Sequence, residues 1–229
     1  MPADMSKRTL PAPIAAVIFD LDGLLLDTER LALEAGAEAM AELGHPLGQA
    51  FLLTLVGADA QANAARINAH LGTDYDAARI TSAWNAALDR RTAVAGVPVK
   101  PGAPGFLADL ARRGLPFAVA TNSHTANAES KIERSALAGQ VPVLVGVDQV
   151  RAGKPAPDVY LEAARRLGVA PRDAVAFEDS DLGARAARTA GLFVVQIPDA
   201  TRPSPGLAHM VAETLGDGAR AVGLAFETS

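Results

Sequence analysis

The chain has 229 residues, of which 49% are apolar and 21% charged, enough for the core of one large domain or of a domain with an insertion. Its formal net charge is −5 without a long block of one sign, so we expect neither a nucleic-acid partner nor binding to an anionic membrane. An anionic substrate would need local positive charge. The absence of cysteine excludes disulfides and thiolate chemistry and is typical of a cytoplasmic protein.

The first 13 residues carry three prolines and scattered charges, with no apolar segment of signal-peptide length. We expect residues 1–13 to form a flexible tail rather than a targeting segment. No apolar stretch approaches the roughly 20 residues that a membrane-spanning helix needs. We therefore expect no membrane partner.

An apolar run at residues 16–19 leads directly into two carboxylates, Asp20 and Asp22, followed by Gly23. Such a run without alternation predicts a strand buried on both faces, as in parallel sheets. Burying carboxylates without partners is costly, so a cation or a proton must compensate them. The competing interpretation is a helix N-cap followed by a turn aspartate.

The next segment, to about residue 95, is rich in alanine and has helical rather than strand spacing. Leu31, Ala35, Ala39 and Leu43 predict a first helix that stops at Gly44. A second helix is expected from an Asp59 cap to Gly72, and a third from Ala77 toward Arg91. We interpret this block as a helical unit inserted after the first strand, with hinges near 27–30 and 96–102.

From Pro101 onward the pattern alternates between strands and helices. This alternation predicts βαβ units, a parallel sheet and right-handed crossovers. The expected helices cover residues 105–113, 126–137, 158–167 and 182–189, and the expected strands cover 117–120, 141–145, 174–177 and 193–197, the last closing the sheet.

Polar residues follow several of these strands at the point where each strand ends. Asp20 and Asp22 follow the first, Thr121 and Asn122 the second, and Glu178 and Asp179 the fourth, while Lys154 lies in the loop after the third. The carboxyl ends of parallel strands lie at one edge of the sheet, where open α/β sheets bind ligands. Each residue alone could be a cap or a solvated loop residue. Together, these acids, the hydroxyl and the ammonium indicate a site for a hard cation and a phosphate.

These motifs resemble those of the haloacid dehalogenase-like (HAD) hydrolases, in their phosphatase and β-phosphoglucomutase branch. The resemblance runs from residue 15 to about 197. It comprises Phe19-Asp20-Leu21-Asp22-Gly23, Thr121-Asn122-Ser123, Gly153-Lys154-Pro155 and Phe177-Glu178-Asp179-Ser180. It implies an α/β fold, a Rossmann-like parallel sheet (residues 14–28 and 97–229) with an all-α helical cap (residues 29–96) that acts as a mobile lid.

The resemblance also implies the roles of individual residues. Asp20 would be the nucleophile, and Asp22 the general acid and base. Thr121, Asn122 and Lys154 would bind the substrate phosphate. Mg²⁺ would be held by Asp20, the main chain of Asp22 and Asp179, with Glu178 as a direct or a more distant ligand. The expected partner is a small phosphorylated metabolite, and the expected state is a monomer.

Two other functions stay open: a sugar phosphomutase that uses the same phospho-aspartate, and a non-catalytic phosphate-binding protein. The cap positions that match phosphate-handling residues of the β-phosphoglucomutase branch are Ala32, Val56, Gly57 and Ala60. None of their side chains binds phosphate, so hydrolysis is the expected outcome, although Arg66 or Arg79 could substitute. Dehalogenases resemble the chain less well, because they need neither the second aspartate nor the metal carboxylates.

Overall fold

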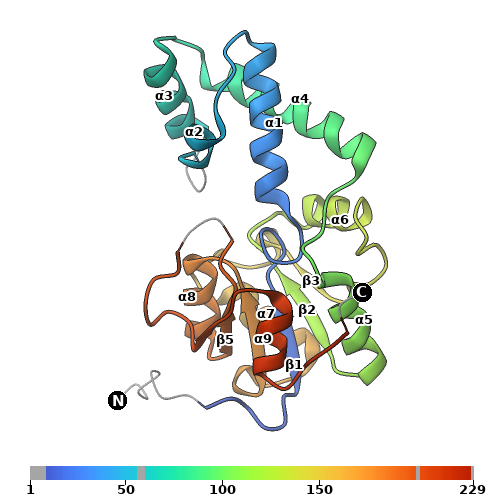
Figure 1. The fold of residues 1–229 in the computed structure, drawn as a ribbon. Coiled ribbons are helices and arrows are strands. Elements are labelled where there is room, and N and C mark those ends of the chain that lie inside the picture. Colours follow the sequence, from blue (N-terminus) through green and yellow to red (C-terminus); the bar gives the residue numbers. More distant parts are fainter. Residues whose placement is uncertain (1–8, 56–59, 200–201, 228–229) are drawn as a thin grey trace. The chain divides into compact units, whose positions relative to one another are not determined.

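The computed structural model describes residues 9–55, 60–199 and 202–227 (Figure 1). Most of the expected tail at 1–13, the expected cap residue Asp59, and Val56 and Gly57 lie outside these ranges. The chain divides into two compact units. One is Asp27–Pro98, and the other combines the described residues up to Leu26 with those from Val99 onward.

The larger unit contains a six-stranded sheet in which every neighbouring pair is parallel, in the order β3-β2-β1-β4-β5-β6. The strands are β1 (Ala16–Phe19), β2 (Phe117–Ala120), β3 (Leu144–Val145), β4 (Ala174–Glu178), β5 (Phe193–Gln196) and β6 (Met210–Val211). The chain builds outward from β1 to β3 on one side, then returns to place β4 beside β1. The strand order therefore reverses between β1 and β4, the position where such sheets form a ligand-binding crevice.

Helices cover both faces of this sheet because alternate residues of each buried strand point to opposite sides. On one face, Ile18 packs in a cluster with residues of α7 (Asp158–Leu167) and α8 (Asp181–Ala190). On the other, Phe19 makes an edge contact with Phe106 of α5 (Ala103–Arg113). α9 (Leu215–Ala221) lies on that second face, since a side chain at Gly218 would meet Val195 and Phe177. α6 (Thr125–Glu133) follows β2.

The main features of this unit match the expectation, and three details correct it. The helix expected over 126–137 ends at Glu133, and the strand expected over 141–145 is reduced to Leu144–Val145. The strand at 193–197 does not close the sheet, because β6 pairs with its outer edge. β6 is only two residues long and partly exposed, so it carries no alternation from which a strand could be predicted.

The smaller unit is built from α1 (Thr28–Glu42), α2 (Gln49–Leu53), α3 (Ala60–Leu71) and α4 (Ala77–Ala95). α1 and α4 pack closely because Gly36 faces the Trp84 ring, where an added β-carbon would lie 2.2 Å from a ring atom. α2 was not expected, since its five residues are too few for a helical period to be recognised. No helix in the described ranges is both long and apolar enough to span a membrane.

Candidate active site

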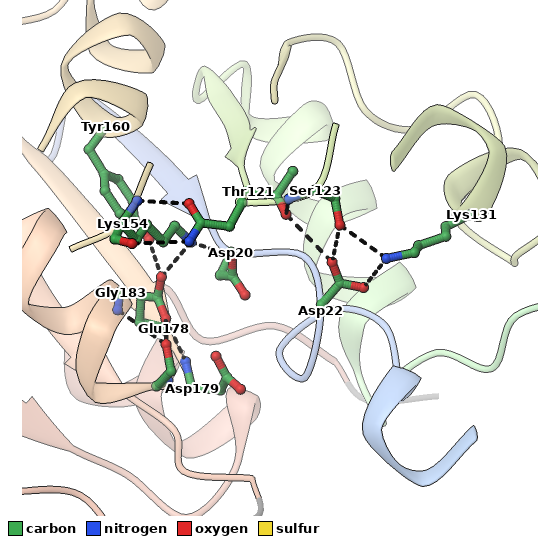
Figure 2. Close-up of polar contacts among 12 residues, drawn as sticks. Asp20, Asp22, Thr121, Ser123, Lys131, Lys154, Tyr160, Glu178, Asp179 and Gly183 are labelled. Carbon is green, nitrogen blue, oxygen red and sulfur yellow. Dashed lines mark hydrogen bonds and ion pairs between the residues drawn. The ribbon is translucent and has the colours of Figure 1, made fainter. Parts of the chain in front are cut away.

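Five polar residues from four segments meet at the carboxyl edge of the sheet (Figure 2). All five are buried within the core of the larger unit: Asp20, Thr121, Lys154, Glu178 and Asp179. Asp20 directly follows β1, and Glu178 is the last residue of the neighbouring β4. The reversal of strand order between β1 and β4 therefore places these two carboxylates side by side, as the sequence pattern predicts.

Lys154 is the buried cation of this cluster. Its Nζ donates hydrogen bonds to Asp20 Oδ1 and to Glu178 Oε1, the latter at 2.6 Å, and lies 5.0 Å from the centre of the Tyr160 ring. Asn122 fixes the main chain of the lysine from both sides. Its Oδ1 accepts from Lys154 N at 2.7 Å, and its Nδ2 donates to Lys154 O at 3.1 Å. The Asn122 amide thus contacts the main chain of Lys154.

Glu178 is fully buried and both of its carboxylate oxygens accept hydrogen bonds. Oε1 accepts from Lys154 and, at 2.5 Å, from the Tyr160 hydroxyl. Oε2 accepts from the main-chain N–H of Asp179 at 3.1 Å and from Ser180 N and Oγ at 3.3 and 3.1 Å. α8 supplies the space, because a β-carbon at Gly183 would lie 1.7 Å from Oε1.

The electrostatics of the cluster follow from burial. Desolvation raises the pKa of Asp20 to about 7; the Lys154 ammonium opposes this rise and the Glu178 carboxylate adds to it. Burial would lower the pKa of Lys154, but its ion pairs with Asp20 and Glu178 outweigh that effect and raise it. Burial and the nearby Glu178 raise the pKa of Tyr160 well above its ordinary value. The cluster therefore holds a permanent ammonium and a carboxyl group that binds a proton near neutral pH.

Asp22 lies in different surroundings, in the turn after β1 that Gly23 completes with a φ of 86°. Its Oδ2 accepts a hydrogen bond from Ser123 Oγ at 2.8 Å and lies 3.5 Å from Thr121 Oγ1. Its Oδ1 lies 2.7 Å from Lys131 Nζ. The two aspartates of the first motif are thus paired with different lysines, as Figure 2 shows.

The acidic side of the cluster fits a hard divalent cation. Asp20, Glu178 and Asp179 each present a carboxylate oxygen, and these atoms lie within 4.8 Å of one another. Oxygen donors are the ligands that Mg²⁺ prefers. The backbone also approaches closely here, since a β-carbon at Gly23 would lie 2.3 Å from Asp179 Oδ2. These residues would hold the ion, and the oxygens of Glu178 are the most heavily hydrogen-bonded.

Two residues of the site were not singled out from the sequence: Lys131 of α6 and Tyr160 of α7. Both lie on helices, where the side that faces the sheet edge depends on how the helix packs. Tyr160 lies six positions after Lys154, in the first turn of α7, which is only a weak signal. Lys131 sits eight positions after Ser123 with no motif around it, and only the structure brings it to Asp22.

Comparison with known proteins agrees with this fold. The model of the haloacid dehalogenase-like hydrolase family matches residues 14–191. The chain is 32% identical over 186 residues to the fructose-1-phosphate phosphatase YqaB of Escherichia coli, covering 80% of this chain and 96% of that protein. It is 33% identical over 196 residues to the mitochondrial (DL)-glycerol-3-phosphatase 1 of Arabidopsis thaliana, covering 81% of this chain but only 64% of the plant protein.

Among solved structures, the fold is similar to that of a Thermotoga maritima protein provisionally named a beta-phosphoglucomutase. The TM-score is 0.75 and the identity 27%, with 86% of this chain and 93% of the other covered. The fold, the ordered motifs and the length of the family match together define its class. The chain belongs to the haloacid dehalogenase-like hydrolase family and is a hydrolytic enzyme related to named phosphatases.

Proposed function

We propose that the protein is an Mg²⁺-dependent phosphatase that hydrolyses a small phosphomonoester, such as a sugar phosphate, through a phosphoryl group on Asp20. The observation that carries this proposal is the buried cluster in which Asp20 lies against Lys154 and beside Asp179. Relatives named for fructose-1-phosphate and glycerol-3-phosphate support the substrate class. Both of these phosphate esters have a small polyhydroxylated leaving group.

In the first step, a carboxylate oxygen of Asp20 attacks phosphorus, and the bond from phosphorus to the leaving oxygen breaks. Asp22 gives its proton to that oxygen. In the second step, water attacks the phosphoryl group, Asp22 takes a proton from the water, and the bond to Asp20 breaks to release phosphate. Two displacements replace one difficult step.

Other residues position and stabilise the phosphoryl group. The Lys154 ammonium and the Thr121 hydroxyl would contact its oxygens, because both lie beside the two aspartates. Asn122 would act by holding the main chain of Lys154. Asp20 and Asp179 would ligate Mg²⁺, and Glu178 would lie farther from the ion, where it contacts Lys154. The bound ion would supply the positive charge that lets a carboxylate approach an anionic phosphate.

A phosphomutase is the second candidate, favoured by the similarity to the Thermotoga maritima structure. Such an enzyme must hold a second phosphate while its sugar reorients. Ala32 on α1 and Ala60 on α3 offer no group for this, and the other two matching positions lie outside the described residues. We therefore expect water, rather than a second sugar hydroxyl, to receive the phosphoryl group.

One assay separates the two candidates. A panel of sugar and polyol phosphates is incubated with the protein, with Mg²⁺ or with excess chelator, and free phosphate is measured. We expect the protein to release phosphate, and we expect chelation to abolish this release and Mg²⁺ to restore it. β-Glucose 1-phosphate with a trace of the bisphosphate is added as a mutase test. Efficient formation of glucose 6-phosphate in place of free phosphate would overturn the phosphatase assignment.

A further inference from the structure

Lys131 is a second lysine at the site, and the proposed chemistry has so far given it no role. Its Nζ lies 2.7 Å from Asp22 Oδ1 and 3.1 Å from Ser123 Oγ. Ser123 Oγ in turn lies 2.8 Å from Asp22 Oδ2. The three side chains therefore form a closed triangle of polar contacts, which Figure 2 shows on the side of the site away from Lys154.

The triangle constrains Asp22 more than a single ion pair would. Each oxygen of the carboxylate contacts a different donor, and these two donors also contact each other. Rotating the carboxyl group about its bond to the β-carbon would break at least one of these contacts. The donors come from the loop after β2 and from α6, so the core fold itself fixes their positions.

Stability alone does not account for this arrangement. The Lys131 and Asp22 side chains are 32% and 29% exposed, and ion pairs of that exposure contribute little to folding. Lys154, by contrast, is buried between two carboxylates. A partly exposed lysine that contacts an aspartate of the first motif is better explained by what that aspartate does.

We propose that Lys131 is a positioning residue that, together with Ser123, orients the carboxyl group of Asp22 for proton exchange with the leaving oxygen. The inference rests on the proposed function, in which Asp22 is the general acid and base. A carboxyl group offers about four acceptor positions, so it can accept from these donors and still exchange a proton with a bound substrate. Small errors in the position of a catalytic group reduce rates strongly.

The experiment compares two esters in wild type and Lys131→Met. Glycerol phosphate has a poor leaving group that needs a proton, whereas nitrophenyl phosphate has one that leaves as an anion. We expect Lys131→Met to lower kcat for glycerol phosphate by about tenfold or more, with KM little changed and a much smaller effect on nitrophenyl phosphate. Lys131→Arg, which keeps a cationic donor, should recover part of the loss.

The matched control is Arg134→Met, which removes an exposed positive charge at the end of the same helix. This substitution should leave the rates of hydrolysis of both esters unchanged. Ser123→Ala should reproduce the pattern of Lys131→Met, and the double variant should lose less than the product of the two single losses, because both groups hold one carboxylate. Thermal unfolding confirms that each variant is folded.

Two results would overturn the inference while leaving the phosphatase assignment intact. One is an equal loss of activity on both esters with a raised KM, which would mean that the charge of Lys131 serves to bind the substrate. The other is full activity of Lys131→Met on glycerol phosphate. If wild type hydrolyses no ester of the panel with Mg²⁺ present, the proposed function fails, and the inference about Lys131 fails with it.

Discussion

The ammonium of Lys154 and the carboxylate of Glu178 form a buried ion pair, with 2.6 Å between Nζ and Oε1 and side chains that are 5% and 0% exposed. Removing two charges from water costs several kcal/mol for each ion, and one partner seldom offsets that cost. Here Asp20 and Tyr160 add further contacts to the pair. Glu178 therefore anchors the lysine against Asp20, the proposed nucleophile, and a metal ion would find Asp20 and Asp179 more accessible.

Replacing Glu178 by glutamine should be strongly destabilising although the shapes match. A glutamine amide would present N–H groups to the donors that now contact Oε2, and Lys154 would keep a single buried carboxylate. We expect the free energy of unfolding to fall by about 3 kcal/mol or more in denaturant titration. The control is Glu162→Gln, which weakens the two partly exposed ion pairs that Glu162 makes with Arg165 and Arg166 on α7 and should change little. Equal effects of the two variants would contradict the anchoring role.

Gly183 should tolerate no side chain. A β-carbon there would lie 1.7 Å from Glu178 Oε1, and Glu178 has no room to withdraw. Gly183→Ala should therefore lower both the melting temperature and phosphatase activity, with a stability loss of about 2 kcal/mol or more. Gly48→Ala is the matched control, because nothing lies within 4 Å of that position and its φ of −73° suits alanine. A stable, active Gly183→Ala protein would show that the Glu178 contacts are not required.

The raised pKa of Asp20 predicts how the metal-free protein responds to pH. Between about pH 4 and pH 7 the folded state holds a proton on Asp20 that the unfolded state has lost. The contribution of this group to the free energy of unfolding therefore falls as pH rises through that window. The same proton competes with a bound cation, so the affinity for Mg²⁺ should increase as pH rises toward and past about 7.

Calorimetric titration with Mg²⁺ and urea unfolding over this pH range measure both effects. Asp20→Asn removes the titrating group and serves as the control, since it should lose the pH dependence that Asp20 supplies. If wild type and Asp20→Asn show the same pH dependence of stability, Asp20 does not titrate in this window.

The two aspartates of the first motif should respond differently to amidation. Asp20→Asn removes the attacking oxygen and should abolish turnover of every ester. Asp22→Asn keeps the nucleophile but cannot deliver a proton. The rate of hydrolysis should therefore fall by about 100-fold or more for glycerol phosphate and much less for nitrophenyl phosphate. Steady-state rates on both esters provide the measurement. Equal loss on both esters for both variants would contradict the division of roles.

Much of the core could be predicted because its elements carry strong local signals. The strand at Phe117–Ala120 and the helix at Asp158–Leu167 occur as expected, since a buried apolar run and a clear amphipathic period define them. The juxtaposition of Asp20 with Glu178 also followed from sequence, because parallel strands bring their carboxyl ends together. These inferences need only periodicity and topology.

What could not be predicted depends on packing between elements. Lys131 reaches Asp22 only because α6 is rotated to present it, and no local pattern specifies that rotation. The same holds for Tyr160, whose hydroxyl contacts Glu178 from α7. β6 and α9 were missed because both are short, and α9 also contains glycines. Such elements are stabilised by their neighbours rather than by their own sequence. The lid movement, the monomeric state and the cytoplasmic location stay predictions.

The most direct test of the account is to locate the phosphoryl group on the enzyme. The protein is mixed with a phosphate ester that it hydrolyses, quenched rapidly in acid, and digested for peptide mass spectrometry. We expect a phosphoryl group on Asp20 in wild type, its accumulation in Asp22→Asn with nitrophenyl phosphate, and its absence from Asp20→Asn. Turnover of the ester by Asp20→Asn, or a phosphoryl group on any other residue, would contradict this expectation.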